Sequence, residues 1–80
     1  MKLLRDVTEE FRMPADSYAA IFETNHGIAV AWGRAYDSLA NDKPYLAGNT
    51  DEHGVTYHSS IAAAEKEVAK VAEAHASVRG

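Results

Sequence analysis

The sequence predicts a small α+β domain spanning residues 1–80, in which an antiparallel sheet of three to four strands packs on an N-terminal helix and a long C-terminal helix. Apolar residues recur at helical spacing near both ends of the chain, and the middle alternates bulky and small residues as strands do. The chain has no cysteine, so neither a disulfide nor a thiolate-bound metal supports the fold. A chain this short therefore depends on a modest apolar core.

The first residues predict an amphipathic helix. In KLLRDVTEEFR, Leu3 or Leu4, then Val7 and Phe11, follow three- and four-residue steps, and charged residues fill most of the other positions. Pro14 is expected to end this helix, because the residue before a proline disfavours the helical conformation.

Residues 17–38 predict a β-hairpin. In GIAVAWGRAYDS, Ile28, Val30 and Trp32 alternate with alanine and glycine, so one face is bulky and the other is small and thinly covered. A turn at Asn25-His26-Gly27 joins this segment to SYAAIFET, since glycine takes a positive φ easily.

The next part of the chain predicts a loop and then one or two strands. LANDKPY is turn-forming, because asparagine, aspartate and proline each favour turns. Residues 44–57 hold either two strands, YLAG and VTYHS, around the turn NTDEHG, or a single strand after a long loop. VTYHS has the alternation of a strand in both cases.

The last twenty residues predict a long helix. Ser59 or Ser60 is its expected N-cap, and alanine, glutamate and lysine dominate its sequence. Its inner stripe includes Val68, Val71 and His75. We expect His75 to be a partly buried histidine near a helix C-terminus, where the helix dipole favours its cation.

The stretch AGNTDEHGVTYHSS raises the question of a metal or catalytic site. Carboxylates and imidazoles such as those of Asp51, Glu52, His53 and His58 bind zinc, but no second short-spaced pair completes a ligand set. We therefore expect a solvated hairpin tip followed by an exposed strand histidine, with no metal.

Nucleophilic catalysis is also not expected. Ser59 and Ser60 lie beside His58, but adjacent positions of a strand point their side chains apart, and no nucleophile elbow or glycine-rich phosphate loop is present. We therefore predict a protein without enzyme activity or cofactor.

Net charge indicates the class of partner. The charge of −4 lies entirely in residues 13–58, because the acids and bases of residues 1–12 and of residues 59–80 balance. An acidic surface repels nucleic acid phosphates and attracts a basic protein surface. The candidate contact residues are four loop acids and one aromatic residue: Asp37, Asp42, Asp51, Glu52 and Tyr45. The alternative is that these acids only keep the protein in solution.

The order helix–strand–strand–strand–helix resembles the double-stranded-RNA-binding domain. That resemblance implies a nucleic-acid-associated module with a basic cluster at the start of its last helix. Here that position reads SSIAAAEKEVAK, which lacks the cluster. As an alternative function, such a module would use Arg5, Arg12, Lys66 and Lys70 on the helical side.

A small, acidic, cysteine-free α+β chain that ends in a strand, a serine cap and an alanine-rich helix is also similar to proteins of phages and mobile elements, the anti-CRISPR proteins among them. This resemblance implies a stoichiometric inhibitor that occupies a Cas protein surface meant for DNA. It makes a host protein the expected partner, with no direct binding to nucleic acid.

Two further expectations concern location and assembly. MKLLRDVTEE is not a signal peptide, and no segment reaches the roughly 20 apolar residues that cross a bilayer, so we expect a cytoplasmic protein that binds no membrane. The last helix carries a stripe of alanines that would let a second copy approach closely and form a homodimer: Ala62, Ala69, Ala72 and Ala76. The alternative is that alanine is present for its helix propensity alone.

Overall fold

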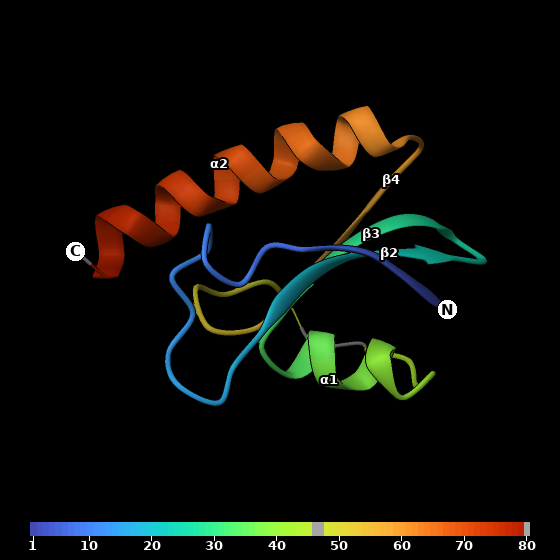
Figure 1. Cartoon of the computed structure of the whole chain (residues 1–80), viewed down its shortest axis with the longest axis horizontal. Helices are drawn as coiled ribbons and strands as arrows, with labels where there is room; N and C mark the ends of the chain where they lie inside the picture. The colour runs from blue at the N-terminus through green and yellow to red at the C-terminus, as the bar shows by residue number, and fades with distance from the viewer. Residues whose placement is uncertain (46–47, 80) are drawn as a thin grey trace.

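In the computed structural model, two helices cover opposite faces of one antiparallel sheet (Figure 1). The structure describes residues 1–45 and 48–79. The elements in chain order are β1 (Lys2–Asp6), β2 (Ala19–Thr24), β3 (Gly27–Trp32), α1 (Arg34–Ala40), β4 (Gly54–His58) and α2 (Ile61–Arg79). The four strands lie in the order β1-β2-β3-β4, so β2 and β3 are central. The predicted α+β class, the sheet and the long C-terminal helix are confirmed.

The predicted N-terminal helix is wrong, because residues 2–6 form the edge strand β1, which pairs antiparallel with β2. The register shifts between Leu3 and Arg5, so Leu4 occupies an irregularity in the strand and packs on the core. Helical spacing survives only in one turn after the strand, where the Phe11 N–H donates to the Val7 carbonyl at 3.1 Å. Both side chains of that turn are fully buried.

The predicted β2–β3 hairpin is confirmed. Its register runs from Ala19 opposite Trp32 to Thr24 opposite Gly27. Gly27 has a φ of 117°, the positive value that the sequence led us to expect at this position. The Thr24 hydroxyl stabilises the turn, since it accepts the His26 N–H at 3.0 Å and donates to the Gly27 carbonyl at 2.9 Å.

The two faces of the sheet form two separate apolar clusters. The bulky face, which includes Ile21, Val30 and Trp32, packs under α2 with Ala64 and Val68. The small face is not thinly covered as predicted, because α1 lies against it. The cluster between this face and α1 consists of Ala20, Phe22, Ala29 and Ala31 of the sheet with Ala35 and Leu39 of α1. Alanine on this face leaves room for a short helix to approach the sheet closely.

Helix α1 (Arg34–Ala40) occupies positions that were expected to end the second hairpin strand, GIAVAWGRAYDS, and to begin the loop LANDKPY. It has seven residues, and Gly33, at the cap position with a φ of 64°, offers it no side chain. Of the two strands considered in residues 44–57, VTYHS is present as β4. Tyr45 and Gly48 of the other candidate, YLAG, are not in a strand. Residues 46–47 of that candidate lie outside the described residues.

Helix α2 begins as predicted. The Ser60 hydroxyl accepts the Ala63 N–H at 3.1 Å, and the Ser60 carbonyl accepts the Ala64 N–H at 3.1 Å. His75 is more buried than expected, at 3% exposed, with its ring centroid 5.1 Å from that of Phe11 and 5.8 Å from that of Trp32. Within the described ranges, no helix combines the length and apolar character needed to cross a bilayer.

Candidate functional site

The acidic turn before β4 is built on the side chain of Thr50. The Thr50 hydroxyl accepts the N–H groups of Glu52 at 3.2 Å and His53 at 3.0 Å. The Thr50 N–H donates to the His53 carbonyl at 2.8 Å and closes the turn. A serine or threonine hydroxyl that satisfies the backbone N–H groups ahead of it is a common way to fix a turn.

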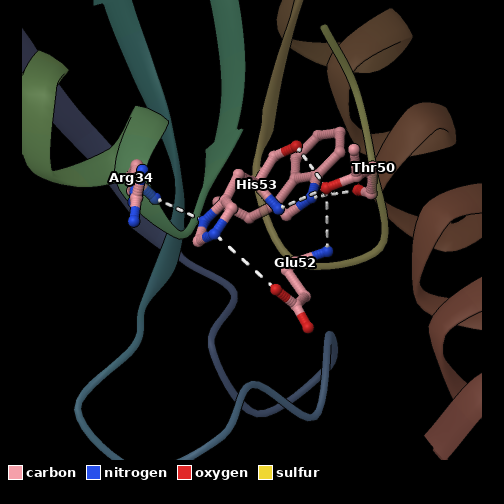
Figure 2. Close-up of polar contacts among 5 residues, drawn as sticks. Arg34, Thr50, Glu52 and His53 are labelled. Atoms are coloured by element: carbon pink, nitrogen blue, oxygen red, sulfur yellow. Dashed lines mark hydrogen bonds and ion pairs between the residues drawn. The ribbon is translucent and has the colours of Figure 1, made fainter. Parts of the chain in front are cut away.

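His53 ties this turn to α1. Its Nδ1 accepts the backbone N–H of Arg34 at 3.1 Å, so this imidazole caps the first turn of the helix in place of the missing side chain of Gly33 (Figure 2). The first N–H groups of a helix have no partner within it, and an external acceptor satisfies one of them here. An acceptor role for Nδ1 requires a neutral imidazole with its proton on Nε2.

The loop is fixed at two further points. The indole N–H of Trp32 donates to the Thr50 carbonyl at 2.9 Å, and the Val55 N–H donates to Asn49 Oδ1 at 3.0 Å. The expected hairpin tip is therefore a loop packed on the end of β3 and on α1. His53 is half-buried rather than solvated, and the strand histidine His58 is half-buried rather than exposed, which corrects the expectation for both residues.

The described histidines and acids of this stretch make separate contacts. His58 Nε2 lies 2.8 Å from the hydroxyl of Thr56, on the same face of β4, and His53 Nε2 lies 3.8 Å from Glu52 Oε2. Over residues 1–45 and 48–79, no group of three or more metal-ligating side chains is close enough to hold an ion. Ser60 is engaged as the cap of α2.

A second cluster brings an acid of β1 and an acid of α1 together around the Tyr36 side chain. The Tyr36 ring lies 5.4 Å from that of Tyr18 and 5.6 Å from that of Phe22. Burial first, and then the charges of Asp6, Tyr18 and Asp37, raise the pKa of the Tyr36 phenol above its ordinary value of 10.0. Asp6 of β1 and Asp37 of α1 therefore act on the same phenol, although they lie far apart in the sequence.

Tyr18 extends this cluster to the surface. Its side chain is 47% exposed and lines a hollow of about 460 Å³ with Asp6, Thr8, Glu9 and Glu10. Sequence reasoning missed Asp6 and Glu9, because the charges of residues 1–12 balance when they are only counted, and it missed Tyr18, which carries no charge to count. In the fold that balance is spatially divided, since Arg5 lies opposite Ile21 of the α2 side and Asp6 opposite Ala20 of the α1 side.

The five predicted contact residues fall into three places. Asp42 and Tyr45 line one groove at the end of α1. Asp37 lies beside Tyr36, with Asp6. Asp51 and Glu52 belong to the turn before β4, and Asp51 also lines a hollow of about 340 Å³ against α2. All four acids are exposed, and Tyr45 is half-buried.

Two of the four basic residues of the alternative function, Arg5 and Lys70, lie beside acids. The Arg5 guanidinium is 3.0 Å from Glu10 and 3.7 Å from Glu65. Lys70 lines the same hollow as Glu67, and Lys66 is exposed on α2. Arg12 is exposed and follows the turn that contains Phe11.

The alanines proposed for self-association differ in exposure. Ala62 and Ala69 are exposed, Ala76 is half-buried, and Ala72 is half-buried against the core cluster under α2. Ala72 therefore already packs within its own chain, and the outer part of the stripe is left facing solvent.

A comparison of this chain with known proteins found no match to a protein-family model, to a curated protein or to a solved structure.

Proposed function

We propose that this chain is a non-catalytic binding protein that places an acidic surface on a basic surface of another protein. The surface, named here the acidic α1 face, consists of Asp6, Glu9, Asp37 and Asp42 around helix α1. The observation that carries the proposal is the exposed ring of Tyr18, which lies against Tyr36 of α1 and lines one hollow with Asp6 and Glu9.

Charge and aromatic character together support a protein partner. Exposed tyrosines are frequent in protein interfaces, where a large ring adds contact area at a low cost in conformational entropy. Carboxylates around the ring attract lysine and arginine and repel phosphate. Arg34 and Lys43 are the only bases in the acidic middle of the sequence, so the negative charge of this region is in excess.

The specific form of the proposal is an anti-CRISPR inhibitor of a DNA-targeting surveillance complex, acting in the cytoplasm of the host cell. The carboxylates of the acidic α1 face would lie where DNA phosphates lie in the working complex. Asp51 and Glu52, in the turn that caps the start of α1 through His53, would do the same. Tyr45 would contribute an aromatic contact beside Asp42.

A competition experiment tests this form. A purified surveillance complex is mixed with labelled target duplex, and the protein is added at increasing concentration. We expect the duplex to be released, with a loss of potency as salt is raised, because exposed charges are screened. Retention of the duplex at a large excess of the protein, for every DNA-targeting type tried, would contradict the specific form.

A matched pair of variants tests the surface itself. Asp37→Lys and Glu73→Lys make the same charge change on an exposed helical position, the first on α1 and the second on the solvent side of α2. We expect Asp37→Lys to slow association with the complex, and Glu73→Lys to leave it unchanged. Equal effects of the two reversals would show that net charge, not the acidic α1 face, governs binding.

A further inference from the structure

A groove beside the acidic α1 face combines apolar walls with one carboxylate. It has a volume of about 560 Å³ and lies where the end of α1, the β2–β3 turn and β4 meet. We name it the tyrosine groove, and its lining residues are Met1, His26, Leu39, Asp42, Pro44, Tyr45 and Tyr57. Its volume is within the range of roughly 300–1,000 Å³ that is usual for ligand-binding clefts.

The walls of the groove are apolar and partly aromatic. Leu39 is 1% exposed, whereas Tyr57 and Met1 are 44% and 53% exposed. Tyr45 packs against the cluster under α1, so its ring is held in place. The Tyr57 ring meets that of His26 at an interplanar angle of 86°, with centroids 6.3 Å apart, which leaves Tyr57 supported on one side.

Asp42 is the single carboxylate of the groove. Its side chain is 72% exposed, and a φ of 58° turns the chain at this point, just after α1. The Met1 nitrogen lies 2.8 Å from Asp42 Oδ1, so a hydrogen-bond donor reaches this carboxylate at the groove, and an incoming guanidinium would take the place of that nitrogen.

A ligand that matches the groove has a long apolar stem and a cationic end. Arginine and lysine side chains have this form, since their methylene stems lie along apolar surface while the charge stays near water. Arginine fits better, because its planar guanidinium stacks on tyrosine rings and bonds a carboxylate with two parallel N–H groups.

We propose that the tyrosine groove binds an arginine side chain of the basic partner. The methylene stem of that arginine lies on Leu39 and Tyr45, and its guanidinium lies between Tyr57 and Asp42. This inference rests on the proposed function, because a basic partner supplies the arginine. It gives the surface a preference for arginine over lysine, which attraction between exposed charges alone does not provide.

Two peptides of equal charge test the preference. Acetylated hexa-arginine amide and hexa-lysine amide are titrated into the ¹⁵N-labelled protein at low salt, and amide shifts are followed by NMR. We expect hexa-arginine to bind more tightly and to shift the amides of His26, Asp42 and Tyr57. Equal affinity of the two peptides, or shifts confined to other residues, would overturn the inference.

Variants separate this inference from the proposed function. Tyr57→Leu keeps an apolar wall but removes the ring, and Asp42→Asn removes the charge. Each should weaken hexa-arginine binding by about three- to fivefold and reduce its advantage over hexa-lysine. The matched control is Asp16→Asn, because Asp16 is also an exposed aspartate with a positive φ, of 68°. Circular dichroism checks that each variant is folded.

The outcomes are distinct. One outcome is that Asp37→Lys slows association with the surveillance complex, whereas Tyr57→Leu and Asp42→Asn bind hexa-arginine as the wild type does. That outcome overturns the assignment of arginine to the tyrosine groove and leaves the acidic α1 face in place. Failure of both peptides to bind at low salt overturns the inference and the proposed function together.

Discussion

His53 Nδ1 and the backbone N–H of Arg34 are joined by a hydrogen bond of 3.1 Å that spans 19 positions of the sequence. Through this bond the loop that precedes β4 caps the helix that follows β3. Changes to the loop therefore reach α1 and the acids that it carries.

Removal of the cap should destabilise the protein. His53→Ala deletes the acceptor, and we expect the free energy of unfolding to fall by about 1 kcal/mol. His53→Asn is the matched control, because its side-chain oxygen can take the place of Nδ1 and should retain most of the stability. Urea unfolding followed by the fluorescence of Trp32, the only tryptophan, measures both. Equal loss in the two variants would show that the ring packs rather than caps.

Gly33 should tolerate no side chain. A Cβ at this position would overlap the Glu52 carbonyl oxygen and His53 Nδ1, and its φ of 64° disfavours any other residue. We expect Gly33→Ala to lower the free energy of unfolding by about 2 kcal/mol or more. Gly48→Ala is the control, since a Cβ there meets nothing within 4 Å. An unfolding midpoint for Gly33→Ala equal to that of Gly48→Ala would contradict the packing of the loop on α1.

Because of Tyr36, the free energy of unfolding should fall as the pH becomes alkaline. Because its pKa is raised in the folded chain, the folded state holds the phenolic proton more tightly than the unfolded state. That contribution is fully present below pH 10 and is lost as the pH rises above it. The difference between the wild type and Tyr36→Phe, in absorbance titration and in unfolding free energy, isolates this group. A difference titration centred at or below pH 10 would refute the raised pKa.

Self-association through α2 is tested by molar mass. Size-exclusion chromatography with light scattering measures the molar mass at tens of micromolar protein. A homodimer that packs through the alanine stripe should give a mass near twice the chain mass of 8.7 kDa. Ala69→Glu should dissociate it, because a buried unpaired charge is strongly unfavourable. Ala74→Glu places the same change on the opposite flank of the helix and should have no such effect. A wild-type mass near one chain excludes this dimer.

Binding to free nucleic acid distinguishes the alternative function. The acidic α1 face predicts no shift of labelled duplex DNA or RNA at micromolar protein and low salt. A module built on Arg5, Arg12, Lys66 and Lys70 predicts a shift that weakens steeply with salt. A strong, salt-sensitive shift would replace the inhibitor proposal with the nucleic-acid module.

The parts of the fold that were predicted from sequence are those whose signal is local. The β2–β3 hairpin follows from strand alternation around a glycine turn, and α2 from a serine cap followed by good helix formers. Helix α1 was not predictable in this way, because the group that caps it comes from a distant loop. The first residues were misjudged because Leu4 sits in a strand irregularity and Val7 and Phe11 form only one turn.

The acids of the candidate site also divide into those that the sequence alone revealed and those that only the folded structure reveals. Counting charges along the sequence found Asp37 and Asp42, but it hid Asp6, whose neighbour Arg5 cancels it in a linear count. A strand sends successive side chains to opposite faces, so Asp6 joins the α1 side while Arg5 meets Glu65 of α2. Only the pairing of β1 with β2 places that acid beside Tyr36.

The sandwiching of β2 and β3 between two helices has a consequence for how the molecule opens. Amides of these strands are paired on both edges and covered on both faces, so they should exchange with deuterium only through global unfolding. Helix α1 is short and is capped from a loop, so its amides should exchange through smaller openings. The proposed binding surface is thus carried by the less protected part of the chain, and a bound partner should slow exchange in α1 while leaving the sheet unchanged.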